Sequence, residues 1–172
     1  MSAVTIRPAT ADDDAALVAI DHATWSAVSS PAPPPPPPPG RRGFFDPVPA
    51  VRDVLVADAG GTLAGYVALR PASQAASNAH VIAVAGLAVD PAWQGRRIGR
   101  RLVAAAVAMA QSRGARRVRL HVLGHNAAAR RVYEACGFVV EGVLRDEFLL
   151  DGRYVDDVLM ARDLTSDDEG PS

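Results

Sequence analysis

The most informative segment of this sequence is Val89-Asp90-Pro91-Ala92-Trp93-Gln94-Gly95-Arg96-Arg97-Ile98-Gly99-Arg100-Arg101-Leu102. An apolar, β-rich run from Val81 to Val89 ends at an Asp-Pro pair. A short turn that contains glycine follows, and a long helical pattern then begins. This order predicts a strand, a tight turn and a helix.

The turn has the composition of a phosphate-binding site. Glycine leaves backbone N–H groups uncovered, and a helix start adds unpaired N–H groups and the positive end of the helix dipole. Four arginines, at positions 96, 97, 100 and 101, crowd the same helix start, where the dipole disfavours cations unless an anion is bound there too. A multiply charged anion, such as a pyrophosphate with a further phosphate nearby, would resolve that conflict.

Two familiar phosphate motifs are excluded. A P-loop ends in Gly-Lys-Ser/Thr, and this chain contains no lysine. A dinucleotide fingerprint needs Gly-x-Gly-x-x-Gly after an early strand, whereas Gly95 and Gly99 have a different spacing and lie in mid-chain. One alternative stays open, in which the two glycines only shape a strand-to-helix turn and the arginines form a solvated face.

The whole chain limits the class of protein. Its 172 residues predict one domain, and a formal net charge of −1 does not favour a nucleic-acid partner. The single cysteine excludes an intramolecular disulfide, and the four histidines lack metal-ligand spacing. No apolar run approaches the roughly 20 residues that span a bilayer, and no signal-like segment is present. We expect a cytoplasmic protein without a metal or a membrane partner, from a GC-rich bacterial genome that uses arginine in place of lysine.

Hydrophobic periodicity predicts a mixed α/β domain over residues 1–164. The expected strands are Val4–Pro8, Val54–Asp58, Leu63–Arg70, His80–Val89, Arg116–Leu123, Phe138–Leu150 and Arg153–Arg162. The expected helices run from Thr10 or Asp12 to Thr24, from Arg97 to Arg113, and from a cap at Asn126 to a stop at Gly137. A proline-rich loop, residues 29–43, is inserted after the first helix, and the acidic residues 165–172 are expected to be a disordered tail.

With this order in view, the chain resembles the GCN5-related N-acetyltransferase (GNAT) family. Two motifs carry the resemblance, the strand end and loop from Leu87 to Gly99 and the helix from Asn126 to Phe138. It implies a single α+β domain whose mixed, mostly antiparallel central sheet is flanked by helices. One departure is present: the family loop usually reads Gln/Arg-x-x-Gly-x-Gly/Ala, and Arg97 stands at its first glycine. A side chain there is compatible with a helical backbone, so we expect altered contacts but not lost binding.

The resemblance implies acetyl-CoA as the co-substrate, held largely by backbone groups. Leu87 and Val89 would pair with the pantetheine arm, and a nearby backbone N–H would polarise the acetyl carbonyl. The N–H groups from Gln94 to Arg100 would hold the pyrophosphate, and Asn126 would bond the arm, cap its helix, or do both. The predicted cofactor-binding set is Leu87, Ala88, Val89, Gln94, Gly95, Arg96, Arg97, Ile98, Gly99, Arg100, Asn126 and Tyr133.

The resemblance also implies catalytic roles. Tyr133 would donate a proton to the departing CoA thiolate, or else be a buried aromatic of its helix. A base for the amine is harder to find, because the strand Val81–Leu87 carries no carboxylate where many relatives have a glutamate. Glu147, Asp46 and His80 are candidates, as is solvent. Glu147 is included in the predicted site because the last hairpin would face the acceptor cleft.

The acceptor pocket is expected to be formed by the segment from about Trp25 to Phe45 together with the last hairpin. Trp25, Phe44 and Phe45 flank the run Pro33–Pro39 in a chain with only 5% aromatic residues, and we predict that they bind the substrate. We interpret the chain as an acetyl-CoA-dependent N-acetyltransferase, a possible homodimer, that acetylates a primary amine by direct attack in a ternary complex. The amine would belong to a small molecule, amino acid, polyamine or protein N-terminus. The alternatives are a non-catalytic acyl-CoA-binding sensor and a proline-tract interaction module.

Overall fold

The computed structural model describes residues 3–35, 43–46 and 49–165. Its strands are β1 (Thr5–Pro8), β2 (Val54–Asp58), β3 (Leu63–Pro71), β4 (Val81–Val89), β5 (Arg117–Leu123), β6 (Val139–Leu150) and β7 (Arg153–Asp163). Its α-helices are α1 (Asp14–Thr24), α2 (Ile98–Ser112) and α3 (Ala127–Glu134). Each agrees with the predicted element to within a few residues. The predicted acidic tail, apart from Thr165, lies outside the described residues, as do residues 36–42 of the proline-rich loop.

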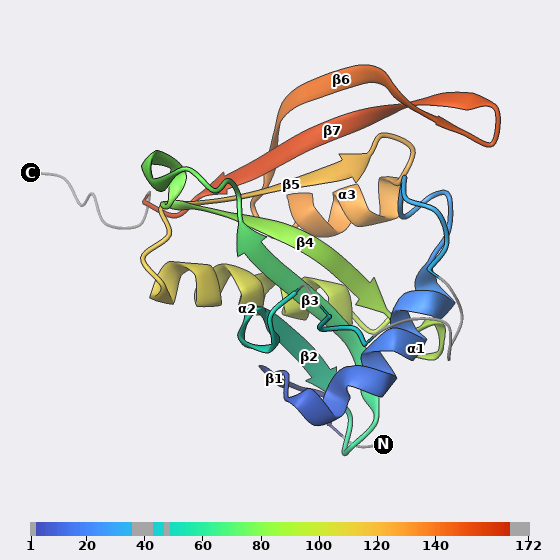
Figure 1. The fold of residues 1–172 in the computed structure, drawn as a ribbon, viewed down its shortest axis with the longest axis vertical. Helices are drawn as coiled ribbons and strands as arrows, with labels where there is room; N and C mark the ends of the chain where they lie inside the picture. The colour runs from blue at the N-terminus through green and yellow to red at the C-terminus, as the bar shows by residue number, and fades with distance from the viewer. Residues whose placement is uncertain (1–2, 36–42, 47–48, 166–172) are drawn as a thin grey trace, which may run out of the picture.

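All seven strands form one sheet in the order β1-β2-β3-β4-β5-β7-β6 (Figure 1). Neighbouring strands are antiparallel except β4 and β5, which are parallel. The mixed, mostly antiparallel sheet is therefore confirmed. Asp151 and Gly152 join β6 to β7 with φ angles of 49° and 75°, the pair of positive values that a type I′ hairpin turn requires.

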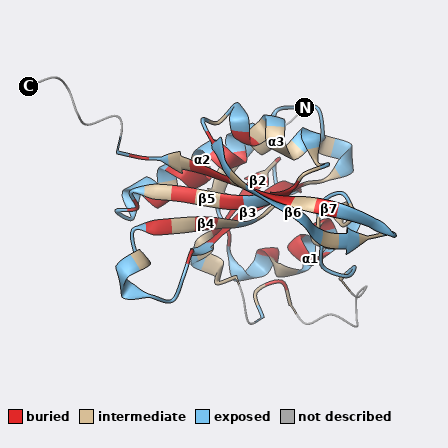
Figure 2. Cartoon of the chain, turned by 90° about the horizontal axis from the view of Figure 1, so that it is seen from above, coloured by how far each residue is buried: buried red, intermediate tan, exposed pale blue. Residues whose placement is uncertain are grey.

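The helices cover both faces of the sheet (Figure 2). Helices α2 and α3 lie on one face and α1 lies on the other. Alternate residues of β5 and β7, such as Leu120 and Met160, are fully buried against α2 in the main core. Leu102 and Ala106, four residues apart on α2, are fully buried in the same cluster, as an amphipathic helix requires. Burial of one such leucine stabilises the fold by about 1.5–3 kcal/mol.

Helix α1 is fixed to the first strand by an ion pair. Arg7 on β1 bonds the Asp13 carboxylate at 2.8 Å, and the backbone N–H of Thr10 donates to the same carboxylate at 2.8 Å. The hydrogen bond from Arg7 is the main reason that the pKa of Asp13 is lowered to about 2. This ion pair attaches the start of α1 to the sheet, and α1 in turn covers one side of the cleft described below.

The parallel pair β4–β5 is short, and the two strands then diverge. Only Val81–Ala83 pair with Arg117–Arg119. Ala85 is an extra residue in β4, because the register with β3 shifts between its neighbours Val84 and Gly86. From Val84 onward, the β5-facing edge of β4 has no strand partner among the described residues. This divergence opens the sheet where the predicted site lies.

Within the described ranges, no helix is long and apolar enough to cross a membrane.

Candidate active site

Three adjoining cavities lie where β4 and β5 diverge. The turn cavity, about 490 Å³, lies between the Gly95 turn and α3. The cleft cavity, about 420 Å³, lies between β4, β5 and α3. The acceptor-side cavity, about 320 Å³, lies between β4 and α1 with the segment that follows it. Leu87 lines all three cavities, so the end of β4 is the point where they meet.

The glycine turn is held in an open conformation by local hydrogen bonds. Asp90 accepts the N–H of Ala92 at 2.8 Å, and the Gln94 side-chain amide donates to the carbonyl of Val89 at 3.2 Å. Gly95 has a φ of +75°, and a Cβ built there would meet no atom within 4 Å. The space beside this turn is therefore open to a ligand.

Arg97 corrects one expectation of the sequence analysis. It is the N-cap of α2 and has a φ of +60°, which is the left-handed region and not the helical backbone that we expected. Glycine adopts this conformation without strain, whereas other L-residues pay about 1–2 kcal/mol. This left-handed conformation explains why the family loop usually has glycine at this position. Arg97 adopts the same backbone conformation with that unfavourable energy.

Gly99 and Ile98 have different surroundings although both are in the predicted loop. Ile98 is 2% exposed and belongs to the core, so only its backbone can serve a ligand. A Cβ at Gly99 would lie 3.8 Å from side-chain atoms of Val89 and Val132, which is ordinary contact. A larger side chain would extend into the turn cavity that Gly99 lines.

The end of β4 presents alternate backbone groups to the opening. Asp90 donates its N–H to Ala64 of the β2–β3 hairpin at 3.0 Å. Because successive residues of a strand point their N–H groups to opposite edges, Leu87 and Val89 direct theirs toward the diverging β5 edge. These are the groups predicted to pair with a pantetheine arm.

Helix α3 contributes Asn126 and Tyr133 to the cleft cavity. The Asn126 Oδ1 accepts the N–H of Ala129 at 3.1 Å, so the predicted helix cap is present. Tyr133 is 7% exposed and packs against Phe138, with the ring centroids 5.8 Å apart. Burial raises the pKa of Tyr133 to about 12, so its hydroxyl keeps its proton at neutral pH and can donate it.

A histidine–aspartate pair faces the same cleft. His121 on β5 and Asp157 on β7 both line the cleft cavity, and the His121 Nδ1 lies 2.6 Å from the Asp157 Oδ2. Asp157 is 6% exposed, whereas the His121 side chain is 46% exposed. The carboxylate therefore orients the imidazole and leaves Nε2 toward the open side, an arrangement that suits a general base.

Tyr133 and His121 lie on opposite faces of the sheet. Tyr133 belongs to the core cluster that includes α2, and so do Leu120 and Val122, the neighbours of His121 in β5. Since side chains alternate along a strand, His121 points to the α1 face. A substrate in the cleft would thus have a proton acceptor on one side and a proton donor on the other.

The acceptor-side cavity is closed by α1 and the segment after it. Trp25 lines this cavity and donates its indole N–H to the carbonyl of Ala32 at 3.0 Å. Tyr66 on β3 donates to Asp21 on α1 at 2.6 Å, and both line the cavity. Ser29 lines this cavity and the other two.

The other predicted aromatics lie elsewhere. Phe44 is 4% exposed in the core, 4.8 Å from the ring of Tyr66, and Phe45 packs edge-on against it at 5.3 Å. Neither lines the three cavities. Phe44 can therefore influence an acceptor only through the position of Tyr66.

The predicted bases do not line the cleft cavity. Glu147 is exposed and does not line it, whereas its neighbour Phe148 does. The register of β6 shifts between Leu144 and Phe148, so strand alternation does not fix the side of Glu147, and its role as a base stays a prediction. His80 and Asp46 are exposed and line none of the three cavities.

Comparison with known proteins assigns the family. The family model described as the acetyltransferase (GNAT) family matches residues 17–138. The chain belongs to the GNAT family.

A GNAT-like fold is also found among solved structures. The smu.2055 protein of Streptococcus mutans has a TM-score of 0.80 at 27% identity, covering 93% of this chain and 99% of that one. The yncA protein of Salmonella typhimurium, solved with its cofactor acetyl-CoA, has a TM-score of 0.77 at 22% identity, covering 99% and 98%.

The relatives found by sequence similarity are named for different acceptors. A mycothiol acetyltransferase of Sanguibacter keddieii is 34% identical over 126 residues, which are 69% of this chain and 40% of that protein. An L-amino acid N-acetyltransferase of Escherichia coli is 33% identical over 109 residues, which are 63% of this chain and 66% of that protein. The chain spans only 18% and 40% of the lengths of two mycothiol acetyltransferases that it matches.

The pair in this GNAT chain that sequence reasoning missed is His121 with Asp157. The two residues are 36 positions apart, and no local motif joins them. The sequence contained one sign of it. His121 is a polar residue between apolar neighbours, and the alternation of strand residues places it on the same face as Arg117 and Arg119. In the described part of the chain, no group of three or more His, Cys, Asp and Glu side chains could hold a metal ion.

Proposed function

We propose that the chain is an acetyl-CoA-dependent N-acetyltransferase that acetylates a primary amine by direct attack in a ternary complex. The observation that carries this proposal is the cleft through the sheet, with His121 and Tyr133 on opposite faces and the open Gly95 turn at its mouth. The likeness of the fold to yncA, which was solved with acetyl-CoA, supports the co-substrate.

The chain's own residues fit acetyl-CoA. Open space at Gly95, the small Gly99 and the unpartnered edge of β4 would hold the pyrophosphate and the pantetheine arm. When bound, acetyl-CoA would supply an activated acetyl group: the amine nitrogen bonds to the acetyl carbon, the carbon–sulfur bond breaks, and the products are an N-acetyl amine and CoA. A backbone N–H near Leu87 at the end of β4 would donate to the carbonyl oxygen as negative charge develops there.

His121 would act as the base on the acceptor side. An ordinary alkyl amine has a pKa near 10.4, so only about one in 10³ molecules is neutral at pH 7 without help. The Nε2 of His121 would accept the proton that the amine nitrogen loses, while Asp157 holds the imidazole by its Nδ1. This pair would act as the general base in place of a carboxylate on β4, which this chain lacks.

Tyr133 would act on the leaving side. Its hydroxyl is protonated at neutral pH, so it would donate a hydrogen bond and then a proton to the CoA sulfur, although the raised pKa opposes the full proton transfer. A thiol of pKa about 8.5 is a tolerable leaving group, and the expected gain is therefore moderate.

We infer that the acceptor carries a carboxylate beside its amine. Arg70 lines the cleft cavity, and its guanidinium makes a long hydrogen bond, of 3.4 Å, to the carbonyl of Pro71. A guanidinium in this position suits a carboxylate. The likeness to an L-amino acid N-acetyltransferase agrees with this acceptor class.

An acceptor panel tests the proposal. Purified protein with acetyl-CoA is offered L-amino acids, the matching L-amino acid amides, and spermidine, and CoA release is measured by a thiol reagent. We expect release with amino acids, less with the amides, and least with spermidine. Equal rates with acids and amides would reject the carboxylate. Acetyl-CoA binding without transfer to any amine would favour the alternative function, a non-catalytic acyl-CoA sensor.

A further inference from the structure

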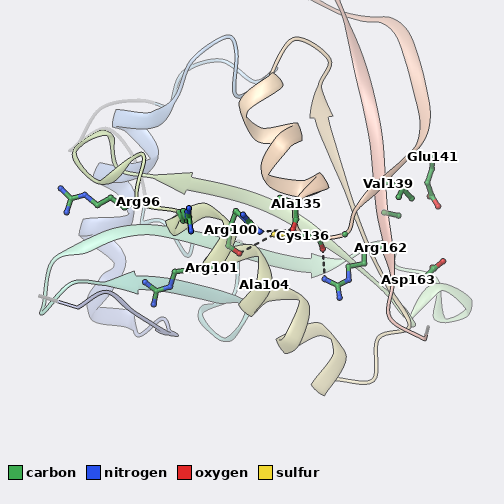
Figure 3. Close-up of a pocket in the computed structure, with 13 residues that line it drawn as sticks. Arg96, Arg100, Arg101, Ala104, Ala135, Cys136, Val139, Glu141, Arg162 and Asp163 are labelled. Carbon is green, nitrogen blue, oxygen red and sulfur yellow. Dashed lines mark hydrogen bonds between the residues drawn. The ribbon is translucent and has the colours of Figure 1, made fainter. Parts of the chain in front are cut away.

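The acceptor-side cavity continues the cleft toward α1. The two cavities share the lining residues Ser29, Ala85, Gly86 and Leu87. The largest cavity of the structure has a volume of about 1000 Å³ and is lined by arginines of α2 and by residues of β6 and β7 (Figure 3). It shares no lining residue with the cleft cavity. A molecule bound in the cleft can therefore extend one of its groups into the acceptor-side cavity.

Small residues of β4 form the passage between the cleft and the acceptor-side cavity. Ala85 is the extra residue of this strand, and Gly86 follows it. A Cβ built at Gly86 would lie 3.5 Å from the Cε2 of Tyr66 and 3.7 Å from its hydroxyl oxygen. A side chain larger than a methyl group at position 86 would therefore fill the space in front of Tyr66. Glycine at this position keeps the passage open.

Rings and proline side chains form much of the wall of the acceptor-side cavity. Trp25 at the end of α1 and Tyr66 of β3 line it, together with Ala32, Pro33 and Pro35 of the segment after the helix. These groups present carbon atoms to the cavity. Aromatic rings also form favourable edge-on or offset contacts with another ring.

Polar side chains of this lining use their hydrogens on the chain itself. Trp25 donates its indole N–H to a backbone carbonyl at 3.0 Å, and the hydroxyls of Thr24 and Ser29 donate to backbone carbonyls at 2.8 and 3.0 Å. The Tyr66 hydroxyl donates to Asp21 at 2.6 Å. A polar group that entered the cavity would lose its water and find these donors already used, which is unfavourable. The lining therefore favours an apolar group.

The groups that would hold the rest of the acceptor lie on the same face of the sheet. Tyr66 belongs to the core cluster under α1, whereas Val67 and Leu69 belong to the cluster under α2. Side chains thus alternate along β3, and Arg70 follows on the face of Tyr66. His121 points to this α1 face as well. Arg70, His121 and Tyr66 therefore border one side of the sheet.

Resting on the proposed function, we propose that the acceptor-side cavity binds a large apolar side chain and that the acceptor is an aromatic L-amino acid such as phenylalanine. Its α-carboxylate would lie at Arg70 and its α-amine at His121, which both line the cleft cavity. Its ring would pass over Gly86 and lie against Trp25 and Tyr66. Contact between rings adds to the burial of apolar area, so an aromatic side chain binds better than an aliphatic one.

A panel of single amino acids tests this acceptor class. Native protein with acetyl-CoA is offered L-phenylalanine, L-alanine, L-arginine and L-glutamate, and CoA release is measured with a thiol reagent. We expect kcat/KM for phenylalanine to exceed that for alanine about 100-fold, because each methylene in an apolar pocket changes this ratio about tenfold or more. Arginine and glutamate should not exceed alanine.

The outcomes of the panel separate this inference from the proposed function. Equal kcat/KM for phenylalanine and alanine would overturn the apolar pocket and leave the proposed acetyl transfer standing. A preference for arginine would also overturn it, and would show that Asp21 binds a cationic side chain. Absence of CoA release with every amino acid and with spermidine would instead count against the proposed function.

Substitution of Trp25 locates the preference in the acceptor-side cavity. Trp25→Ala should lower kcat/KM for phenylalanine about tenfold or more and that for alanine less than about twofold, because only the larger acceptor reaches the ring. Trp25→Phe keeps a ring and should restore most of the preference. Tyr154→Ala removes a 68% exposed ring that lines neither cavity, and it should leave the ratio unchanged.

Tryptophan fluorescence measures acceptor binding without turnover. The chain has two tryptophans, of which Trp25 lines the acceptor-side cavity and Trp93 the turn cavity. With CoA in place of acetyl-CoA, phenylalanine should change the emission of the native protein and of Trp93→Phe, but not that of Trp25→Phe. An equal loss of rate with phenylalanine and alanine in Trp25→Ala, with a lower melting temperature, would make Trp25 a packing residue and overturn its role. If Trp25→Ala does not fold, the native panel and the fluorescence of Trp25→Phe decide.

Discussion

The turn at Gly95 and the acceptor side of the cleft are built in different ways. The turn comes from one continuous segment, Leu87–Arg100, and presents mainly backbone N–H groups. The acceptor side combines α1, β3, β5 and β7, and presents side chains such as His121 and Arg70. Backbone recognition tolerates side-chain changes as long as the conformation holds, whereas the acceptor side depends on the identity of each side chain.

This difference predicts where substitutions act. Changes at the turn should alter affinity for the co-substrate and leave the chemical step intact. Changes on the acceptor side should alter the chemical step and leave affinity for acetyl-CoA intact. Three substitutions test this division, beginning with the largest expected effect, and a fourth tests the backbone strain at the turn.

Replacement of His121 should have the largest effect. His121→Gln removes the proton acceptor and should lower kcat about 10³-fold, with acetyl-CoA affinity unchanged. The side chain is 46% exposed, so the fold should tolerate the change. Steady-state kinetics and calorimetry check both parts. The matched control is His80→Gln at the exposed start of β4, which should retain full activity; equal losses in the two variants would refute the assignment of His121.

Replacement of Gly99 should come next, and should act on binding. Gly99→Val places two methyl groups beyond a Cβ that already lies 3.8 Å from Val89 and Val132, and should weaken acetyl-CoA about 10²-fold. Gly99→Ala should cost only a few-fold. Gly142→Val, where a Cβ meets nothing within 4 Å, is the control. Unchanged affinity in Gly99→Val, measured by calorimetry, would show that the turn does not hold the co-substrate.

Replacement of Tyr133 should have an intermediate effect on rate. Tyr133→Phe keeps the ring that packs on Phe138 and should lower kcat about 30-fold with acetyl-CoA affinity nearly intact. Burial favours the neutral hydroxyl, so its pKa of about 12 lies above the usual 10 and the native rate should not fall through loss of this proton below about pH 11. Tyr154→Phe, at a 68% exposed site, is the control. A lower melting temperature with normal turnover would make Tyr133 a packing residue only.

Replacement of Arg97 should have the smallest effect and should separate strain from charge. Arg97→Gly and Arg97→Ala both remove the guanidinium, but only glycine relieves the φ of +60°. The glycine variant should exceed the alanine variant in unfolding free energy by about 0.5–1 kcal/mol. Urea denaturation measures the difference. Equal stabilities would mean that the left-handed backbone at this position is not strained.

The sequence alone was enough for the elements whose signals are local. Local patterns located the turn at Gly95, the cap at Asn126 and the two strands on either side of Asp151-Gly152. The resemblance to the family added the mixed, mostly antiparallel sheet, which the structure confirms with β4–β5 as its parallel pair. Arg97 shows the limit of local reasoning, since its left-handed backbone follows from how the turn meets α2.

The pairing of His121 with Asp157 was decided by tertiary structure. Side-chain alternation could have placed His121 on one face of β5, but Asp157 reaches it only because β5 and β7 pair in a register that sets Leu123 opposite Asp157. Phe44 likewise looks like a pocket residue from its neighbours in sequence, yet Tyr66 and α1 bury it. Local backbone chemistry needs only adjacent residues and can be read from sequence. The pairing of distant side chains depends on strand register and packing, which are properties of the whole fold.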